Sequence, residues 1–237
     1  MLPPVICCGI PEDGRQRPST MQSLLTEGQR AKPDESDDAL FYAEPRFVQH
    51  LDAAFRARLT ALYRERIPSD AVVLDLMSSW VSHLPEDRQS GQVIGHGLNR
   101  KELEANPRFD RHWCQNLNVT PLLPLADDSV DVALIVAGWQ YLQQPEAVAA
   151  ELLRVVRPGG QLIVAFSNRM FWQKAPRIWS DSSDADRLAY VARVLVAQGW
   201  PSPERIAEAT QLPGPLGWLG AKGDPFFAVV ATRAAGA

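Results

Sequence analysis

The fold is decided by two nearby stretches of the chain, VDVALIV at residues 130–136 and EAVAAELLRVVRPGGQLIVAF at residues 146–166. The first is a continuous apolar run with the length of a buried strand. In the second, apolar residues recur at helical spacing up to residue 156, and the sequence RPGG at 157–160 then ends the helix. Residues 161–166 are apolar again. Strand, helix and strand in this order predict a parallel β-α-β unit.

The same alternation extends in both directions along the chain. Further strands are expected at residues 71–76, 92–95 and 226–232, and further helices at 53–66, capped by Asp52, and at 184–198. The strands show no polar alternation, which is typical of strands buried on both faces. The sequence therefore predicts an α/β domain with a mainly parallel sheet.

Length and composition set the domain organisation. A chain of 237 residues fits one large domain. Residues 1–38 carry five prolines and an acidic cluster at 34–38, so we expect a tail or a loosely packed arm there. Residues 39–237 are expected to form the single folded domain.

Charge and cysteine content exclude several classes of protein. The formal net charge of -4 argues against a nucleic-acid partner. The cysteines number three and form no Cys-x-x-Cys motif or metal-ligand cluster, so neither a disulfide framework nor a bound metal is expected. The apolar runs are too short for a membrane span, and residues 1–10 lack the basic start of a signal peptide. These features predict a cytoplasmic protein with no membrane partner, and they leave open whether it forms a homodimer.

Polar and aromatic side chains follow the predicted strands at their carboxyl ends, where open parallel sheets bind ligands. Asp75 and the Met-Ser-Ser-Trp sequence at 77–80 follow the first strand, and Gly-His-Gly-Leu-Asn at 95–99 follows the second. Residues 137–142 and 167–169 follow the two strands of the β-α-β unit. These segments are the candidates for a binding site.

At this point the sequence resembles the class I S-adenosylmethionine-dependent methyltransferases. The resemblance rests on Val-Asp-Val-Ala at 130–133, Tyr-Leu at 141–142 and Glu-Leu-Leu-Arg-Val-Val-Arg-Pro-Gly-Gly at 151–160, and it extends from about Leu40 to Arg233. It is strongest to a branch similar to methyltransferase type 11, in a subgroup of unassigned substrate. The resemblance implies a Rossmann-like, doubly wound, mainly parallel seven-stranded sheet with an antiparallel last strand. It also implies S-adenosylmethionine as cofactor and S-adenosylhomocysteine as product.

The resemblance also implies which residues bind the cofactor. Asp75 matches the acidic residue beneath the methionine part, and the serines at 78 and 79 stand where the family has a glycine-rich loop. Asn116 falls at the contact to the adenine amino group. Arg46 is a candidate partner for the cofactor carboxylate, or alternatively a surface partner of Glu44 or Asp52. The full set is Arg46, Asp75, Met77, Ser78, Ser79, Gly97, Leu98, Asn99, Asn116, Leu117 and Ala137.

One departure from the family pattern concerns the ribose of the cofactor. The second strand of the family ends in Asp or Glu, which binds the ribose hydroxyls. This chain has Gly97 there, with His96 and Asn99 beside it. Either Asn99 supplies the ribose contact, or cofactor binding is weaker or different.

The acceptor side is expected around the remaining strand ends. Substrate-binding candidates are Trp139, Tyr141, Asn168 and Arg169, of which Arg169 indicates either an anionic substrate or an ordinary ion pair. Candidate general bases are His83, His50 and Tyr42. Five of the seven tryptophans fall near this edge, which indicates an aromatic-lined pocket or, alternatively, core packing of a cap; they are Trp80, Trp113, Trp139, Trp172 and Trp179.

The sequence therefore predicts an enzyme that transfers a methyl group from S-adenosylmethionine to a small-molecule acceptor by in-line displacement. The alternative is a catalytically inactive methyltransferase-like binding or scaffold protein, which Gly97 and the altered first loop favour. A third reading, an α/β enzyme with another nucleotide cofactor, finds little support, because Gly95-His96-Gly97 lacks the third glycine of a dinucleotide motif.

Overall fold

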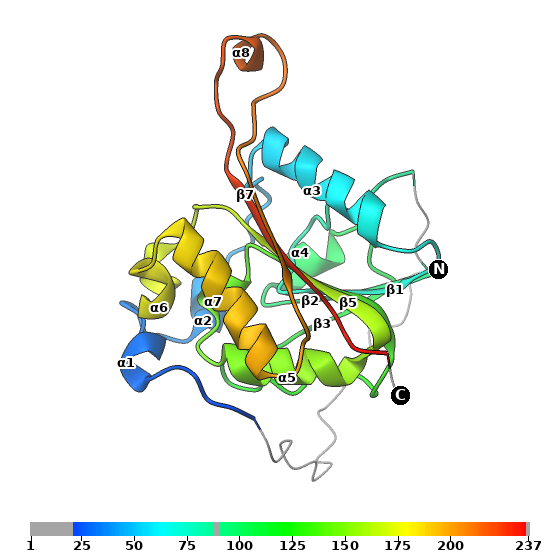
Figure 1. Cartoon of the computed structure of the whole chain (residues 1–237), viewed down its shortest axis with the longest axis vertical. Coiled ribbons are helices and arrows are strands. Elements are labelled where there is room, and N and C mark those ends of the chain that lie inside the picture. Colours follow the sequence, from blue (N-terminus) through cyan, green and yellow to red (C-terminus); the bar gives the residue numbers. More distant parts are fainter. Residues whose placement is uncertain (1–20, 88–90, 236–237) are drawn as a thin grey trace.

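The sheet at the centre of the molecule has the predicted topology. The computed structural model describes residues 21–87 and 91–235. Within these residues the sheet is seven-stranded with the order β3-β2-β1-β4-β5-β7-β6, and β7 runs antiparallel to both of its neighbours. The strands are β1 (Val72–Leu76), β2 (Gln92–Gly97), β3 (Arg111–Cys114), β4 (Val130–Val136), β5 (Val156–Phe166), β6 (Glu204–Glu208) and β7 (Phe226–Thr232). The α/β fold with an antiparallel last strand is confirmed (Figure 1).

Helices cover both faces of this sheet (Figure 1). The three long ones are α3 (Ala53–Arg66), α5 (Pro145–Val155) and α7 (Asp184–Ala197). None of the described helices has the length and apolar character of a membrane span. The short helices are α1 (Glu27–Arg30), α2 (Asp38–Phe41), α4 (Arg100–Glu104), α6 (Arg177–Ser180) and α8 (Pro215–Trp218), with 3-10 turns η1 (Trp139–Tyr141) and η2 (Trp172–Lys174).

The predicted elements are present, with differences that have physical reasons. Asp52 caps α3 by accepting the N–H of Phe55 at 2.8 Å, as expected. β5 begins at Val156 and not at residue 161, because the chain passes from α5 into the strand through a register shift opposite Val130 and Val132. Strands β3 and β6 were not predicted. Their sequences, RHWC and ERIAE, are polar and short because both lie at edges of the sheet.

The core is divided by the sheet into two layers. Leu74 belongs to the cluster that contains α5 and α7, whereas its neighbour Val73 packs with Phe55 and Leu59 of α3. Successive residues of a strand point to opposite faces, so these two contacts show burial on both sides. The apolar strands that the sequence indicates are therefore fully covered.

The amino-terminal arm packs against the domain over the described residues 21–38, and residues 1–20 lie outside the described part. Leu25 is buried, and Arg30 forms a bidentate pair with the buried Glu146 at 2.7 and 2.9 Å. Lys32 pairs with Asp38 at 2.8 Å, and both side chains are buried. The expected loose packing does not hold for residues 21–38, because Leu25 and Arg30 attach the arm to α5 and Asp34 pairs with Lys174 of η2 at 3.0 Å.

The arm predicts a measurable stability effect. Glu146 also accepts the N–H groups of Leu24 and Leu25 at 2.9 and 3.0 Å, so Glu146→Ala leaves several donors without their acceptor. We expect the free energy of unfolding, measured by urea denaturation, to fall by about 1–3 kcal/mol. The exposed Glu44→Ala is the control and should change it by less than about 0.5 kcal/mol. Equal values for the two variants would show that the arm does not contribute.

Candidate functional site

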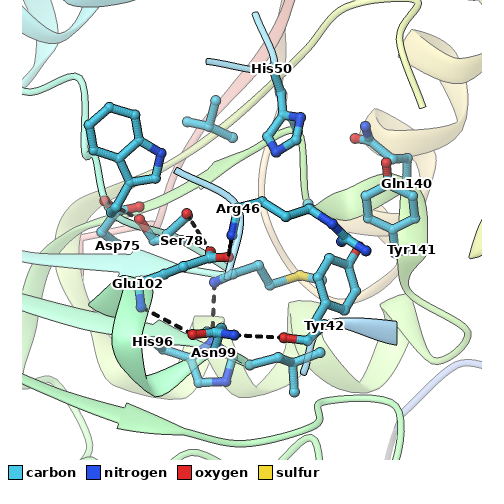
Figure 2. Close-up of a pocket in the computed structure, with 18 of the residues that line it drawn as sticks. Tyr42, Arg46, His50, Asp75, Ser78, His96, Asn99, Glu102, Gln140 and Tyr141 are labelled. Carbon is cyan, nitrogen blue, oxygen red and sulfur yellow. Dashed lines mark hydrogen bonds between the residues drawn. The ribbon is translucent and has the colours of Figure 1, made fainter. Parts of the chain in front are cut away.

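A cavity of about 370 Å³ opens at the carboxyl ends of β1, β2 and β4. It lies where the strand order reverses, between β1 and β4, which is the usual ligand position in such sheets. Its size is within the range of small-molecule sites. All eleven predicted cofactor residues and all three candidate bases line it, and many of them are drawn in Figure 2.

The floor of the cavity is built around the buried ring of His96. Its Nδ1 accepts the N–H of Met77 at 3.1 Å, its carbonyl oxygen accepts the N–H of Ser78 at 2.7 Å, and its Nε2 lies 2.9 Å from the carbonyl oxygen of Gln115. Because Nδ1 is an acceptor, the proton is on Nε2, which donates to Gln115. Burial lowers the pKa of His96 to about 4, so the ring is neutral at pH 7. One neutral histidine thus connects the ends of β1, β2 and β3.

Asp75 is a buried carboxyl group facing the cavity from the end of β1. Ser78 donates its hydroxyl to Asp75 at 2.9 Å, and Ser82 also bonds to it. Burial raises the pKa of Asp75 to about 7, although these two hydrogen bonds act in the opposite direction. The group can therefore be neutral or charged near pH 7. A ligand that carries positive charge would favour its charged form.

The end of β2 has no room for an acidic side chain. A Cβ atom on Gly97 would lie 2.5 Å from the carbonyl oxygen of Ser78, because the loop after β1 crosses directly above it. Asn99 donates both of its amide hydrogens, to the carbonyl oxygens of Tyr42 at 2.8 Å and Ala43 at 3.0 Å. Its oxygen caps α4 through the N–H of Glu102. Asn99 therefore has no donor left for a ribose.

Glu102 is a cavity residue that the sequence analysis did not single out. Its carboxylate accepts the N–H of Arg46 at 2.6 Å and the hydroxyl of Ser79 at 2.5 Å. It comes one helical turn after Asn99, on the same side of the cavity as the missing acidic residue. The family pattern could have suggested that another carboxylate takes the place of the usual acid at the end of the strand. It could not have indicated that this carboxylate is on α4.

Asn116 and Leu117 line the cavity beyond the end of β3, as expected. The Asn116 oxygen accepts the N–H of Asn118 at 3.0 Å and keeps one lone pair. Asn118, which the sequence analysis missed, bonds to Asp38 at 2.8 Å and to the carbonyl oxygen of Tyr141 at 2.9 Å. It thereby joins the arm to the strand-end segments.

The guanidinium of Arg46 lies among aromatic rings and not in a salt bridge with Glu44 or Asp52. Its centre is 4.5 Å from the ring of Phe41, 5.5 Å from that of Tyr42 and 5.3 Å from that of Phe171. Nη2 donates to the carbonyl oxygen of Phe41 at 2.9 Å, while Nη1 is buried without a hydrogen-bond partner in the described part of the chain. The surface-pair alternative for Arg46 is therefore wrong.

The three candidate bases differ in their fitness to accept a proton. Burial raises the pKa of Tyr42 far above its ordinary value, so this hydroxyl stays protonated at pH 7. Burial and the nearby Arg56 lower the pKa of His83 to about 4. The pKa of His50 is also lowered, mainly by burial and also by Arg46. Both histidines are neutral at pH 7 and can accept a proton.

The predicted substrate residues divide into two groups. Tyr141 and Arg169 line the cavity, but Arg169 pairs with Asp224 at 2.7 Å. Trp139 was wrongly placed on the cavity wall, since it is 1% exposed and packs in the core. Asn168 is exposed and lies outside the cavity lining. Gln140 and Phe171 supply the wall instead.

The tryptophans do not form the aromatic pocket that their positions indicated. Trp80 alone lines the cavity, where it donates to the carbonyl oxygen of Val48 at 3.3 Å. Trp179 is buried against Phe166, and Trp172 is 64% exposed. The aromatic side chains of the cavity are instead Tyr42, Trp80, Tyr141 and Phe171.

Asp75 predicts a pH-dependent stability difference. Its pKa is about 7 when folded and near the ordinary 3.8 when unfolded, so the folded state binds the proton more tightly. The protonated carboxyl group of Asp75 makes its full contribution to the stability of the folded state below about pH 4. This contribution is lost as the pH rises to about 7. We expect the melting temperature of Asp75→Asn to exceed that of the native chain by a gap that widens from pH 5 to 7 and is constant above 8. The exposed Asp181→Asn is the control, and a gap independent of pH would contradict the assignment.

Gly97 predicts a steric effect. The Cβ atom of an alanine at position 97 would clash with the carbonyl oxygen of Ser78, which can move only if the backbone of the loop shifts. We therefore expect Gly97→Ala to lower the free energy of unfolding by about 1–3 kcal/mol. Gly28→Ala is the matched control, because a Cβ at Gly28 meets no atom within 4 Å. If urea denaturation gave both variants the native stability, the close crossing of the loop above β2 would be refuted.

Comparisons with known proteins agree with this geometry. Residues 69–164 match the family described as "Methyltransferase domain". A demethylmenaquinone methyltransferase of Renibacterium salmoninarum is 33% identical over 98 residues, which cover 36% of this chain and 41% of that protein. A malonyl-[acyl-carrier protein] O-methyltransferase of Hahella chejuensis is 30% identical over 110 residues, covering 44% of this chain and 39% of that protein. The chain thus spans less than half the length of these relatives.

The fold is also found among solved structures. A SAM-dependent methyltransferase of Thermotoga maritima superposes with a TM-score of 0.53 at 17% identity, covering 75% of this chain and 89% of that one. At this identity the likeness concerns the fold alone. Residues 69–164 therefore match a methyltransferase domain, and the sheet order is that of the class I methyltransferase fold.

Proposed function

We propose that the protein is an S-adenosylmethionine-dependent methyltransferase that acts on a small-molecule acceptor. The observation that carries the proposal is the convergence of all the predicted cofactor residues on one cavity at the switch point of the sheet. Among the acceptors in the relatives' names, demethylmenaquinone is a small molecule and the first candidate for this chain, whereas malonyl-[acyl-carrier protein] is an acyl group carried on a protein.

The apolar side chains and hydrogen-bond acceptors of the cavity fit such a cofactor. Leu98 and Leu117 offer apolar contact for an adenine, and the free lone pair of Asn116 suits its amino group. Glu102 has lone pairs left for ribose hydroxyls after its bonds to Arg46 and Ser79, and so replaces the acid missing at Gly97. The positive methionine end suits the loop at Asp75 and Ser78, where a carboxylate is held by hydroxyl groups.

The residues of the chain then act mainly by positioning. S-adenosylmethionine, when bound, would supply an activated methyl group: an electron pair of the acceptor would form the new bond to carbon, and the two electrons of the carbon–sulfur bond that breaks would stay on sulfur. The cavity walls hold the acceptor in line with that bond, which can supply most of the acceleration. Where the acceptor carries a proton, His50 is the residue best placed to take it, since it is neutral and packs against Phe171 on the acceptor wall.

Calorimetry with S-adenosylhomocysteine, NAD and ATP tests the proposal. We expect saturable binding of S-adenosylhomocysteine alone, lost in Asp75→Ala and weakened in Ser78→Ala, which removes only a hydroxyl. Ser129→Ala, at the opposite end of β4, is the control and should bind normally. No binding of S-adenosylhomocysteine at millimolar concentration would refute the methyltransferase proposal.

A second candidate is a catalytically inactive binding or scaffold protein. The absence of an acid at Gly97 and the full commitment of Asn99 favour it. The two proposals differ in turnover. Transfer of labelled methyl to any acceptor supports the enzyme, whereas cofactor binding with no transfer to an acceptor panel that includes the named substrates supports the scaffold.

A further inference from the structure

Arg46 is a cation in the cavity that no carboxylate of the described residues neutralises. Its Nη1 is buried and without a hydrogen-bond partner among them, and no ion pair to its guanidinium is present there. The carboxylate of Asp52 is used elsewhere, since its oxygens accept the N–H groups of Phe55 and Asp224. A buried donor left unpaired is costly, which points to a ligand as its partner.

The other cations on this side of the cavity are already paired with carboxylates. Arg169 pairs with the buried carboxylate of Asp224. Asp38 is bonded to Lys32 at 2.8 Å and lies 3.6 Å from Lys174. Glu102 accepts the main-chain N–H of Arg46 and the Ser79 hydroxyl, so it faces the start of the arginine and not its end. The guanidinium of Arg46 thus forms no ion pair among the described residues, although the carboxylate of Glu102 also lies on this side of the cavity.

The position of the guanidinium separates it from the predicted cofactor loop. Figure 2 shows it extending toward Tyr42, Tyr141 and Gln140, on the side opposite Asp75. Phe171, one of the rings around it, follows β5 and stacks on Tyr141 at 6.1 Å between ring centres. The guanidinium of Arg46 would repel the positively charged sulfonium of bound S-adenosylmethionine, unless an anion lies between them.

The surroundings of Arg46 also limit the shape of its partner. Tyr42, Tyr141 and Phe171 present flat apolar surfaces, and Val48 and Trp80 also line the cavity. Within such walls a charge-assisted hydrogen bond is stronger than in water. The site thus suits a flat ring for the apolar walls and an anionic oxygen for the guanidinium of Arg46.

We propose that the acceptor side of this cavity binds a flat ring compound that carries a carboxylate or an ionised hydroxyl, and that the guanidinium of Arg46, which lines the cavity, holds its anionic oxygen. The proposal rests on the proposed methyltransferase function for the role of the ring compound as acceptor. It differs from the sequence-based assignment of Arg46 to the cofactor carboxylate, and the two can be separated by experiment.

The probes are 2-naphthoate and its uncharged counterpart 2-naphthamide, titrated by calorimetry with and without saturating S-adenosylhomocysteine. We expect naphthoate to bind about tenfold or more tightly than naphthamide. Arg46→Gln should remove this preference while binding S-adenosylhomocysteine within about twofold of the native chain. Arg46→Lys, which keeps the charge, should retain part of the preference. Arg177→Gln is the matched control on the exposed surface of α6 and should behave as the native chain.

Each contrary result has a distinct meaning. Equal binding of the two probes, or no binding of naphthoate to the native chain, overturns the proposal. Loss of S-adenosylhomocysteine binding in Arg46→Gln with unchanged naphthoate binding also overturns it and assigns Arg46 to the cofactor. If the native chain fails to bind S-adenosylhomocysteine, the methyltransferase function fails, but the naphthoate titrations without it still decide the role of Arg46.

Discussion

The site depends on the hydrogen bonds of one buried, neutral histidine. His96 accepts from the loop after β1 and donates to the segment after β3, so the ends of three adjacent strands are fixed relative to one another. A charged ring would lose the acceptor at Nδ1, and burial prevents this by lowering its pKa to about 4. The cavity is therefore formed before any ligand binds, which reduces the ordering that binding requires.

This arrangement explains the main departure from the family pattern. Because the loop held by His96 crosses above Gly97, the end of β2 cannot carry an acidic side chain. The carboxylate of this side comes instead from Glu102 on α4, which also holds the segment of Arg46 over the cavity. The lack of an acidic side chain at Gly97 is thus accompanied by a carboxylate acceptor at Glu102 on the neighbouring helix.

Much of the fold could be predicted from the sequence, because its signals are local. The apolar run at 130–136, the capped helix at 53–66 and the strand at 226–232 have the predicted bounds. The residues predicted to bind the cofactor line one cavity because the strand ends of a parallel sheet meet at one edge. The packed arm, the Arg169–Asp224 pair and the burial of Trp139 depend on contacts between residues far apart in the chain, which periodicity and motifs do not encode. Glu102 was missed for the same reason.

We infer that the preformed floor around neutral His96 receives an adenosyl cofactor. A crystal structure of the protein with S-adenosylhomocysteine at pH 7 is the decisive experiment. We expect the adenine between Leu98 and Leu117, the amino acid end at Asp75 and Ser78, and His96 still bonded to Met77 and Gln115. A ligand bound outside this cavity, or a His96 ring that turns away from both partners when the ligand binds, would contradict it.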